Sequence, residues 1–315
     1  MASLDLSALT KYTDELSGIL LKESVLMSNT FKYISIQKGV KYKDSINLLT
    51  SALTAQAGGC GAISPAGSTV LSQREIEVCP LKVEESICID EFEQYWAGQL
   101  AKQGSYNEMA PEAFNELYLA DKTSKISNMI DNIFWQGDTT GGVGNLGLCN
   151  GIIQILTETA ATSSVVTGTT VSGALTTANA IAVVDEMIGN IPADIVNADD
   201  LILFMSHANF RTLMQALRNN NYFYNYDGQA FTWVLDNYLN TNVKVVATTG
   251  LVGSDVMLLT PASNLYFGTD SFGEALNGDG FQFWYDMRDN TTYFRAKFKL
   301  GAQVAFPQYC VIKAS

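Results

Sequence analysis

A long helical pattern between Pro111 and Gly137 organises the sequence. Proline is favoured in the first turn of a helix and glycine commonly ends one, and the stretch between them contains neither residue. Its C-terminal half carries apolar residues at helical spacing, namely Leu119, Ile126, Met129, Ile130, Ile133 and Phe134. The sequence therefore predicts a spine helix over residues 111–137 with one apolar face, about 38 Å long at the usual rise per residue.

The region before this helix predicts an extended ribbon. Residues 1–30 have the pattern of a polar, mostly helical arm, and strands are expected over Phe31–Ile36 and Arg74–Val78. Between them, Ala55–Ser68 consists of small residues that cannot build a core. A lone two-stranded ribbon is only marginally stable in water. We therefore expect this one to lie on another surface, with a second copy of the chain as the natural candidate and a loose surface loop as the alternative.

The segments around the spine have simpler patterns. Ile89–Lys102 has the pattern of a second amphipathic helix. The glycine-rich turn 137–151 follows a helix C-terminus and lacks the lysine of a phosphate-binding loop, so we do not assign phosphate binding to it. Thr157–Thr170 is rich in threonine, serine and alanine and has the composition of a linker. A subdomain boundary is placed near it.

The second half has an α/β pattern with short connections. A helix is predicted over Ala174–Gly189, and Ser206 can cap a helix over His207–Leu217. Buried strands are predicted over three apolar runs, Leu201–Met205, Val243–Ala247 and Val256–Leu259. Thr292–Leu300 alternates as a half-buried antiparallel strand. Gly301 is expected to bend this strand into the final segments, Ala302–Phe306 and Cys310–Ile312.

Composition narrows the function classes. The 315 residues favour two subdomains, and a net charge of -13 argues against a main surface that grips phosphates. No apolar run is long enough for a membrane span, and no secretory signal is present. The odd number of cysteines and their wide spacing suggest reduced thiols made in a cytosol; they are Cys60, Cys79, Cys88, Cys149 and Cys310.

Residues with catalytic potential are few. His207 is the only histidine, and there is neither a Gly-x-Ser-x-Gly motif nor a Cys-x-x-Cys pair. Asp286 and Asp289 lie close to Trp284 and Tyr285, a glycosidase-like combination, but sequence cannot set the distance between two carboxylates. The segment 277–280 lacks the ligand spacing of a calcium loop. We therefore expect no catalytic, metal or cofactor site, and no enzyme.

The order of elements resembles the major capsid proteins of tailed bacteriophages, the Hong Kong 97 fold family. The resemblance covers the arm, the ribbon with its glycine-rich tip, the end of the spine at Ile130–Asp138 and the turn into Gly151–Ile153. It continues in the second half through four segments, Ser206–Phe210, Val243–Thr248, Asn264–Asp270 and Gly301–Phe306. The resemblance lies in the order of the elements and in loosely matching sequence patterns, and no single motif is diagnostic.

This resemblance implies an α+β fold of the Hong Kong 97 type in five parts. These are an N-terminal arm (1–30), an extended two-stranded E-loop (31–80), a peripheral domain with the spine helix (81–165), an α/β axial domain (166–290) and C-terminal strands returning to the peripheral domain (291–315). The implied function is a major capsid protein that self-assembles through pentamers and hexamers into an icosahedral shell around double-stranded DNA. The implied location is the virion capsid, assembled in the bacterial host cytoplasm.

The resemblance also implies partners. A portal is expected, and decoration proteins are an optional addition to such shells. Because the ribbon is reached by about residue 31, a separate scaffolding protein is expected too. No membrane contact is expected. Some family members form a lysine to asparagine cross-link between subunits, which we do not predict for this sequence.

Charge is distributed unevenly and suggests how neighbouring copies meet. We expect a basic ribbon base to lie against an acidic segment of a neighbour, where the charges set register and encounter while apolar burial supplies stability. The residues of this predicted contact are Lys32, Lys38, Lys41, Lys43, Glu84, Glu85, Asp90, Glu91 and Glu93.

Three other functions stay open. The same fold also builds nanocompartment shells around enzymes. The aromatic residues of Tyr222–Tyr226 and Phe231–Trp233 fit a packing patch or subunit contact first, and otherwise a carbohydrate-binding or adhesive module. A glycosidase-like enzyme rests on carboxylates and aromatics alone.

Overall fold

A computed structural model of the chain describes most of the residues that carry these patterns. The described residues are 30–56, 58, 66–88, 112–160, 165–169, 173–220, 234–236, 238, 241–270, 281–288 and 291–313. Several predicted features lie outside them, namely the arm before Thr30, most of the ribbon tip, the helix 89–102, the aromatic residues 222–226 and 231–233, the segment 277–280, and Asp289.

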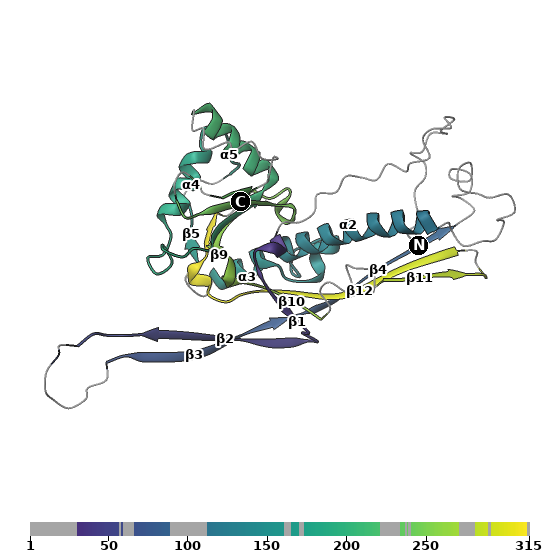
Figure 1. Cartoon of the computed structure of the whole chain (residues 1–315), viewed down its shortest axis with the longest axis horizontal. Helices are drawn as coiled ribbons and strands as arrows, with labels where there is room; N and C mark the ends of the chain where they lie inside the picture. Colours follow the sequence, from purple (N-terminus) through teal and green to yellow (C-terminus); the bar gives the residue numbers. More distant parts are fainter. Residues whose placement is uncertain are drawn as a thin grey trace.

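The spine helix and a five-stranded sheet form one unit of the molecule. Helix α2 (Glu112–Gln136) runs along the sheet, as predicted to within one residue at each end (Figure 1). The sheet has β12 at its centre, with β10 and β11 antiparallel to it and β4 along its other edge. Its strands are β1 (Ser35–Lys38), β4 (Cys79–Cys88), β10 (Leu265–Thr269), β11 (Phe281–Asp286) and β12 (Thr291–Val304).

A six-stranded sheet with two helices forms the second unit. The helices α4 (Ala180–Gly189) and α5 (His207–Asn219) pack against this sheet (Figure 1). The strand order is β5-β13-β9-β6-β8-β7. The strands are β5 (Val166–Thr167), β6 (Leu201–Ser206), β7 (Val234–Leu235), β8 (Lys244–Thr248), β9 (Met257–Pro261) and β13 (Val311–Lys313).

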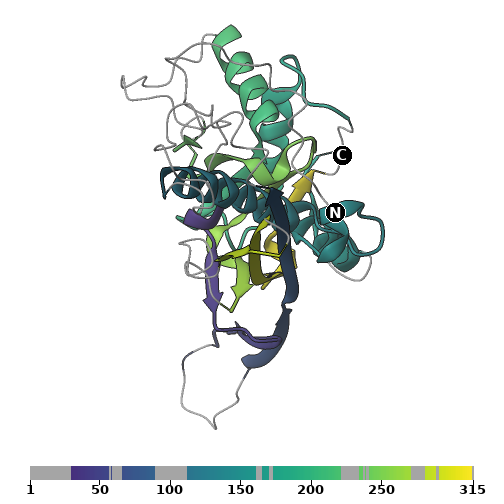
Figure 2. The same cartoon turned by 90° about the vertical axis from the view of Figure 1, so that its right-hand side faces the viewer.

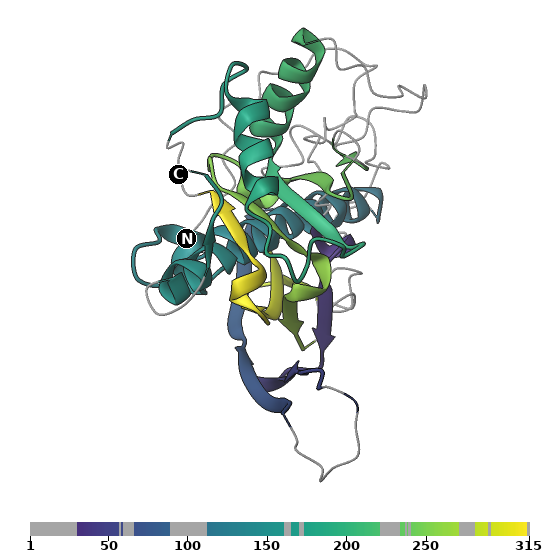
Figure 3. The ribbon, with the colours of Figure 1, turned by 90° about the vertical axis from the view of Figure 1, so that its left-hand side faces the viewer.

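The ribbon is a separate two-stranded sheet that leaves the body of the molecule. Strand β2 (Lys43–Ala52) pairs with β3 (Ser68–Glu77) in an unbroken antiparallel register. Figure 2 and Figure 3 both show it extending from the side of the molecule opposite α4 and α5. The predicted range 31–80 also includes β1 and the start of β4, which lie in the five-stranded sheet.

Short helices connect these parts. Helix α3 (Ile152–Ala160) follows the glycine-rich turn, and five short 3-10 helices occur among the described residues. They are η1 (Thr30–Lys32), η2 (Gly144–Leu148), η3 (Thr249–Leu251), η4 (Ala262–Asn264) and η5 (Pro307–Tyr309).

The structure corrects several predicted boundaries. The strand predicted over 31–36 is displaced, because Phe31 lies in η1 and β1 begins at Ser35. The predicted linker 157–170 begins inside α3. Helix α4 begins at Ala180, six residues after the predicted start, since residues 174–176 have no regular structure and residues 177–179 form a turn.

Gly301 has a different role from the one predicted. Strand β12 continues through Gly301 without ending there. A Cβ at this position would come within 2.2 Å of the Glu77 carbonyl oxygen. Glycine therefore allows the end of the ribbon to approach β12 closely.

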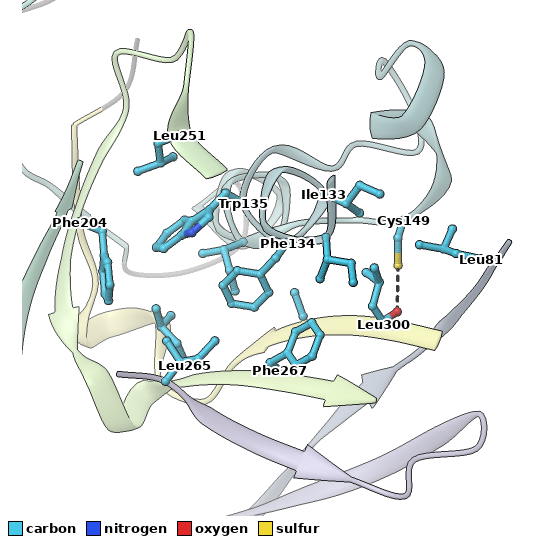
Figure 4. Packing of buried hydrophobic residues seen from close by; sticks show 14 of the residues in the cluster. Leu81, Ile133, Phe134, Trp135, Cys149, Phe204, Leu251, Leu265, Phe267 and Leu300 are labelled. Carbon is cyan, nitrogen blue, oxygen red and sulfur yellow. Dashed lines mark hydrogen bonds between the residues drawn. The ribbon is translucent and has the colours of Figure 1, made fainter. Parts of the chain in front are cut away.

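Two hydrophobic cores hold the units together. One lies around α2, where Ile133 and Phe134 are fully buried in one cluster with Phe267 and Leu300 of the five-stranded sheet (Figure 4). Trp135 is also fully buried and packs on Phe204 of the six-stranded sheet, with ring centroids 5.0 Å apart. The other lies between the six-stranded sheet and the helices α4 and α5. The last segment of the chain is divided between them, since β12 belongs to the five-stranded sheet and β13 to the six-stranded sheet.

Candidate subunit contact surfaces

Among the described residues, the ribbon is supported by its own chain only near its base. Ile46, Leu48 and Ile76 are buried in a small cluster that includes Ala305. Beyond that base the apolar side chains are exposed to solvent, and we call them the ribbon apolar patch. They are Leu49 (64% exposed), Leu53 (88%), Val70 (58%) and Leu71 (70%). Because Leu49 and Leu71 lie directly opposite each other in the register, they form a cross-strand pair on one face of the ribbon.

The five-stranded sheet has one face covered by α2. The ribbon base covers its second face near Gly268 and Gly301, and no described element covers the rest of that face. In β12, Phe294 and Phe298 are buried under α2, whereas Tyr293, Arg295 and Lys297 alternate on the second face. We call this second face the outer sheet face. Cross-strand neighbours on it are Lys82 and Glu84 from β4 and Gln282 and Trp284 from β11.

A shallow cavity of about 320 Å³ lies at one end of the outer sheet face, beside Trp284. The Trp284 ring stacks on Tyr293 with centroids 5.5 Å apart, and the Arg295 guanidinium lies 5.1 Å from the Trp284 centroid. Arg295 also forms an ion pair with Glu84 at 2.7 Å. Trp284 remains 38% exposed. We call Trp284, Tyr293 and Arg295 the Trp284 platform, because an exposed tryptophan held by stacking and by a cation is a rigid apolar surface of the kind that protein contacts favour.

The ribbon and the outer sheet face have compatible directions. In Figure 1 the ribbon, α2 and the strands β4, β11 and β12 all run along the long axis of the molecule. The ribbon extends toward one end of that axis and the sheet toward the other, and both lie on the side away from α4 and α5.

The structure describes the predicted basic contact residues. Lys43 already pairs with Glu77 at 3.0 Å and Glu75 at 3.9 Å in its own ribbon. The hydrogen bond from Lys43 to Glu77 raises the pKa of Lys43. Lys38 and Lys41 are exposed and have no acidic partner among the described residues, and Lys32 is an exposed residue of η1. Lys38 and Lys41 are thus the lysines best placed for a neighbour.

The predicted acids are engaged within the chain where the structure describes them. Glu84 pairs with Lys82 at 2.9 Å, and the hydrogen bond from Lys82 lowers the pKa of Glu84. Glu85 lies on the face toward the spine and pairs with Lys122 at 2.7 Å. The remaining acids lie outside the described residues and are Asp90, Glu91 and Glu93. The pairing of a lysine cluster with a neighbour's acids stays a prediction.

A buried junction connects the spine to the second unit through η3. The fully buried Asp131 of α2 accepts hydrogen bonds from the Thr249 hydroxyl at 2.7 Å and from the Gly250 N–H at 2.6 Å. A Cβ on Gly250 would come within 2.2 Å of the Trp135 ring, so only glycine fits here. Gln136 donates to the Gly250 carbonyl at 2.6 Å. The end of the spine is thus fixed to the six-stranded unit by polar contacts as well as by packing.

In this structure two of the cysteines are joined, contrary to the expectation of reduced thiols. Cys79 and Cys149 form a disulfide with their Cα atoms 5.9 Å apart. They are 70 positions apart in sequence, and spacing alone cannot reveal that β4 passes beside the turn after α2. Cys88 and Cys310 are free thiols, and burial raises the pKa of Cys310 to about 12. Cys60 lies outside the described residues.

The residues considered for catalysis have structural surroundings. His207 is a buried residue in the first turn of α5, and its pKa is lowered by burial and by nearby Arg211. Ser206 caps that helix as predicted, accepting from the Asn209 N–H at 3.3 Å. Asp286 accepts from the Arg288 N–H at 2.9 Å in the turn after β11.

No group of three or more potential metal ligands occurs among the described residues. None of their helices is long and apolar enough to span a membrane.

Comparison of the whole chain with known structures identifies the fold. No family model and no curated protein matches the sequence. The fold, however, matches a chain of Mycobacterium phage Ogopogo, with 12% identity, a TM-score of 0.59 and coverage of 98% of both chains. It also matches a chain from the capsid of Myoviridae phage XM1, with 14% identity, a TM-score of 0.55 and coverage of 95% of this chain and 96% of the other.

A third match is to the procapsid of satellite phage P4, a structure that includes a size determination protein. The identity is 14%, the TM-score 0.54, and the coverage 91% of this chain and 94% of the other. The chain thus has the α+β, Hong Kong 97-type fold of tailed-phage capsid proteins along nearly its whole length. The fold predicted from the order of elements is confirmed.

Neither of the two candidate apolar surfaces was predicted from the sequence. The ribbon apolar patch carried a signal, since Leu49 and Leu53 lie in a segment expected to project from the body. The Trp284 platform carried none, because the stacking of Trp284 on Tyr293 follows from the register of β11 on β12. Which side chain lies opposite which is a property of the folded sheet.

Proposed function

We propose that this chain is the major capsid protein of a tailed, double-stranded DNA bacteriophage, and that it assembles into pentamers and hexamers of an icosahedral shell. The observation that carries the proposal is a projecting ribbon with exposed leucines, on a fold that matches phage capsid structures over nearly the whole chain. The same matches favour a structural role over an enzymatic one and do not favour a carbohydrate-binding module.

The contact that builds the shell is the ribbon of one copy on the outer sheet face of the next. The ribbon apolar patch supplies surface that is costly to leave in water, and the Trp284 platform supplies a complementary apolar surface at the other end of the molecule. Different surfaces meet in such a contact, so it is head-to-tail. A head-to-tail contact forms a closed ring when the rotation between copies closes, as in a pentamer or a hexamer.

Partners and location follow from this proposal. The shell encloses double-stranded DNA without reading its sequence, in keeping with a net charge of -13 that lets the nucleic acid slide along the wall. A portal and a separate scaffolding protein are its expected partners, decoration proteins are an optional addition, and assembly takes place in the host cytoplasm. A nanocompartment shell of the same fold is the second candidate, and the contents of purified particles distinguish the two.

The test is assembly of the purified chain and of ribbon variants. Size-exclusion chromatography with negative-stain microscopy should find shell-sized particles or capsomers for the wild type. The variant L49D/L71D should abolish them and leave a folded monomer, because both charges would be buried at the contact. As a matched control, Val196→Asp adds a charge at a 45% exposed apolar residue of the other unit and should leave assembly intact.

Two results would overturn the proposal. One is a wild-type chain that stays monomeric under every assembly condition, with or without co-expressed scaffold. The other is an L49D/L71D variant that forms shells as readily as the Val196→Asp control. Nuclease-protected DNA inside the particles would support the phage shell, whereas a single enriched enzyme would support the nanocompartment.

A further inference from the structure

The disulfide between Cys79 and Cys149 lies at the root of the ribbon. Cys79 is the first residue of β4, separated from the last ribbon residue, Glu77, by Val78 alone. Cys149 follows η2 in the turn that leaves the end of the spine helix. The bond therefore ties the point where the ribbon joins the sheet to the segment that follows α2.

Both redox states of this pair fit the same fold. The Cys149 sulfur lies 3.5 Å from the Leu300 carbonyl oxygen (Figure 4), so a reduced thiol there has a hydrogen-bond acceptor in place. The backbone of the turn is also held by hydrogen bonds, since the Asp138 N–H donates to the Leu146 carbonyl at 2.8 Å and the Gly151 N–H donates to the Gly137 carbonyl at 2.8 Å. Cys79 is half-buried whereas Cys149 is 2% exposed, so Cys79 is the more accessible residue of the pair.

The position matters because the chain enters and leaves the ribbon at two points. The first passes through Gly39, whose φ of 80° is a conformation that favours glycine, and ends at β2. The second is the crossing at Val78, whose N–H donates to the Tyr42 carbonyl at 2.9 Å. The disulfide lies one residue beyond this crossing. A change in the angle between ribbon and spine must move one of these connections, and the bond restrains the second.

We propose that Cys79 and Cys149 form a redox-closed restraint on the ribbon. The pair is reduced while the chain assembles in the host cytoplasm, where thiols are kept reduced, and it closes when the particle meets an oxidising environment after release. Only the timing of closure depends on the proposed shell function; the restraint itself does not. Its effect is to fix the ribbon in the orientation it reached during assembly.

Closure proceeds by thiol–disulfide exchange with a low-molecular-weight disulfide such as oxidised glutathione. The Cys79 thiolate attacks one sulfur of the oxidant, forming a mixed disulfide and releasing one reduced thiol. The Cys149 thiolate then attacks the Cys79 sulfur, forming the protein disulfide and releasing a second reduced thiol. The two protons lost by the cysteines end on the two released thiols, so one oxidant molecule is consumed for each bond.

The experiment follows the two cysteines in particles before and after oxidation. Cells producing the full chain are lysed in an alkylating agent, and peptide mapping is expected to find Cys79 and Cys149 alkylated. Particles incubated with oxidised glutathione are expected to yield the Cys79–Cys149 cross-linked peptide and to melt roughly 5 °C or more above reduced particles. The variant C79S/C149S should lose this shift, while C88S, which changes a free cysteine at the far end of the same strand, should keep it.

Three outcomes would overturn the restraint. They are a bond already complete in cells quenched by alkylation, no cross-linked peptide after oxidation, and equal melting temperatures of the oxidised and reduced forms. Microscopy of the same samples reports separately on shell formation. If no particles form, the proposed function fails, and the same peptide mapping and melting on the unassembled chain still decide whether the pair closes as proposed.

Discussion

Two cross-strand leucine pairs in this molecule share their chemistry and differ in their surroundings. Leu203 of β6 lies opposite Leu259 of β9, and these side chains are 0% and 1% exposed. Leu49 of β2 lies opposite Leu71 of β3, and these are 64% and 70% exposed. The first pair is packed in the core of the six-stranded unit, whereas no described part of the chain covers the second. The ribbon pair has the composition of a buried pair but has nothing to pack against among the described residues. This points to a surface supplied by another copy.

Substitutions at these two leucine pairs test the contrast most directly. Leu203→Ala should lower the free energy of unfolding of the unassembled chain by about 3 kcal/mol, because it removes buried methyl groups and leaves a cavity. Leu71→Ala should change the same quantity by less than about 0.5 kcal/mol, since its side chain is already in water. Urea denaturation of the monomer measures both. Shell yield should order the variants differently, with Leu71→Ala reducing assembly even though the monomer keeps its stability.

A loss of monomer stability in Leu71→Ala as large as that in Leu203→Ala would show that the ribbon packs on its own chain. The exposed leucines would then not mark a subunit contact. Leu203→Ile is a suitable control for the core site, because it keeps the volume and should cost less than about 1.5 kcal/mol.

The same contrast holds for polar contacts and predicts a smaller effect. Asp131 is buried and accepts two hydrogen bonds from η3, whereas the Gln73 amide donates to Asn47 at 2.8 Å on the exposed ribbon. Asp131→Ala leaves the buried Gly250 N–H without its acceptor, which should cost about 2 kcal/mol. Gln73→Ala leaves groups that water can satisfy and should cost less than about 0.5 kcal/mol. Urea denaturation of both variants measures the difference.

Asp131→Asn is the control for the buried site, because it keeps the shape of the side chain and one acceptor oxygen. It should therefore cost less than Asp131→Ala. Equal losses in Asp131→Ala and Gln73→Ala would mean that the hydrogen bonds to η3 add nothing to the packing of the spine against the six-stranded unit.

Local patterns predicted the elements of this fold, and long-range pairing decided what they do. The spine at Glu112–Gln136 and the cap at Ser206 followed from residues that are neighbours in sequence, because helix periodicity and capping are local effects. The alternation in β12 likewise predicted which face is buried. By contrast, the Cys79–Cys149 bond and the pairing of β1 with β10 join distant segments. No local pattern encodes such contacts.

The candidate contact surfaces divide in the same way. The need of the ribbon for a partner could be inferred from the small residues between Ala55 and Ser68, which offer nothing to pack against. The uneven distribution of charge could also be seen in the sequence. The sequence does not show, however, that Glu84 and Glu85 form ion pairs with basic residues of β4, β12 and α2 in their own chain. Charges close together in the fold pair with each other, and sequence does not reveal those neighbours.

Substitutions of the lysines at the ribbon base should have the smallest effect on the stability of the monomer, because these exposed side chains differ only in their charged partners. Lys43 has acidic partners in its own ribbon, whereas Lys38 and Lys41 have none among the described residues. Reversing all three to glutamate should leave the monomer soluble and block assembly, because a neighbour's acids would then be repelled. Light scattering measures the rate and extent of assembly.

Two controls separate the lysines from one another and charge from shape. If Lys38 and Lys41 carry the effect, K38E/K41E alone should block assembly, while K38R/K41R keeps the charge and should assemble normally. Wild-type assembly should also slow between about 0.1 M and about 0.5 M salt, because exposed charges are screened more strongly at the higher concentration. If the glutamate variants form shells at ordinary salt, charge pairing is not needed for the contact. The ribbon apolar patch alone would then account for it.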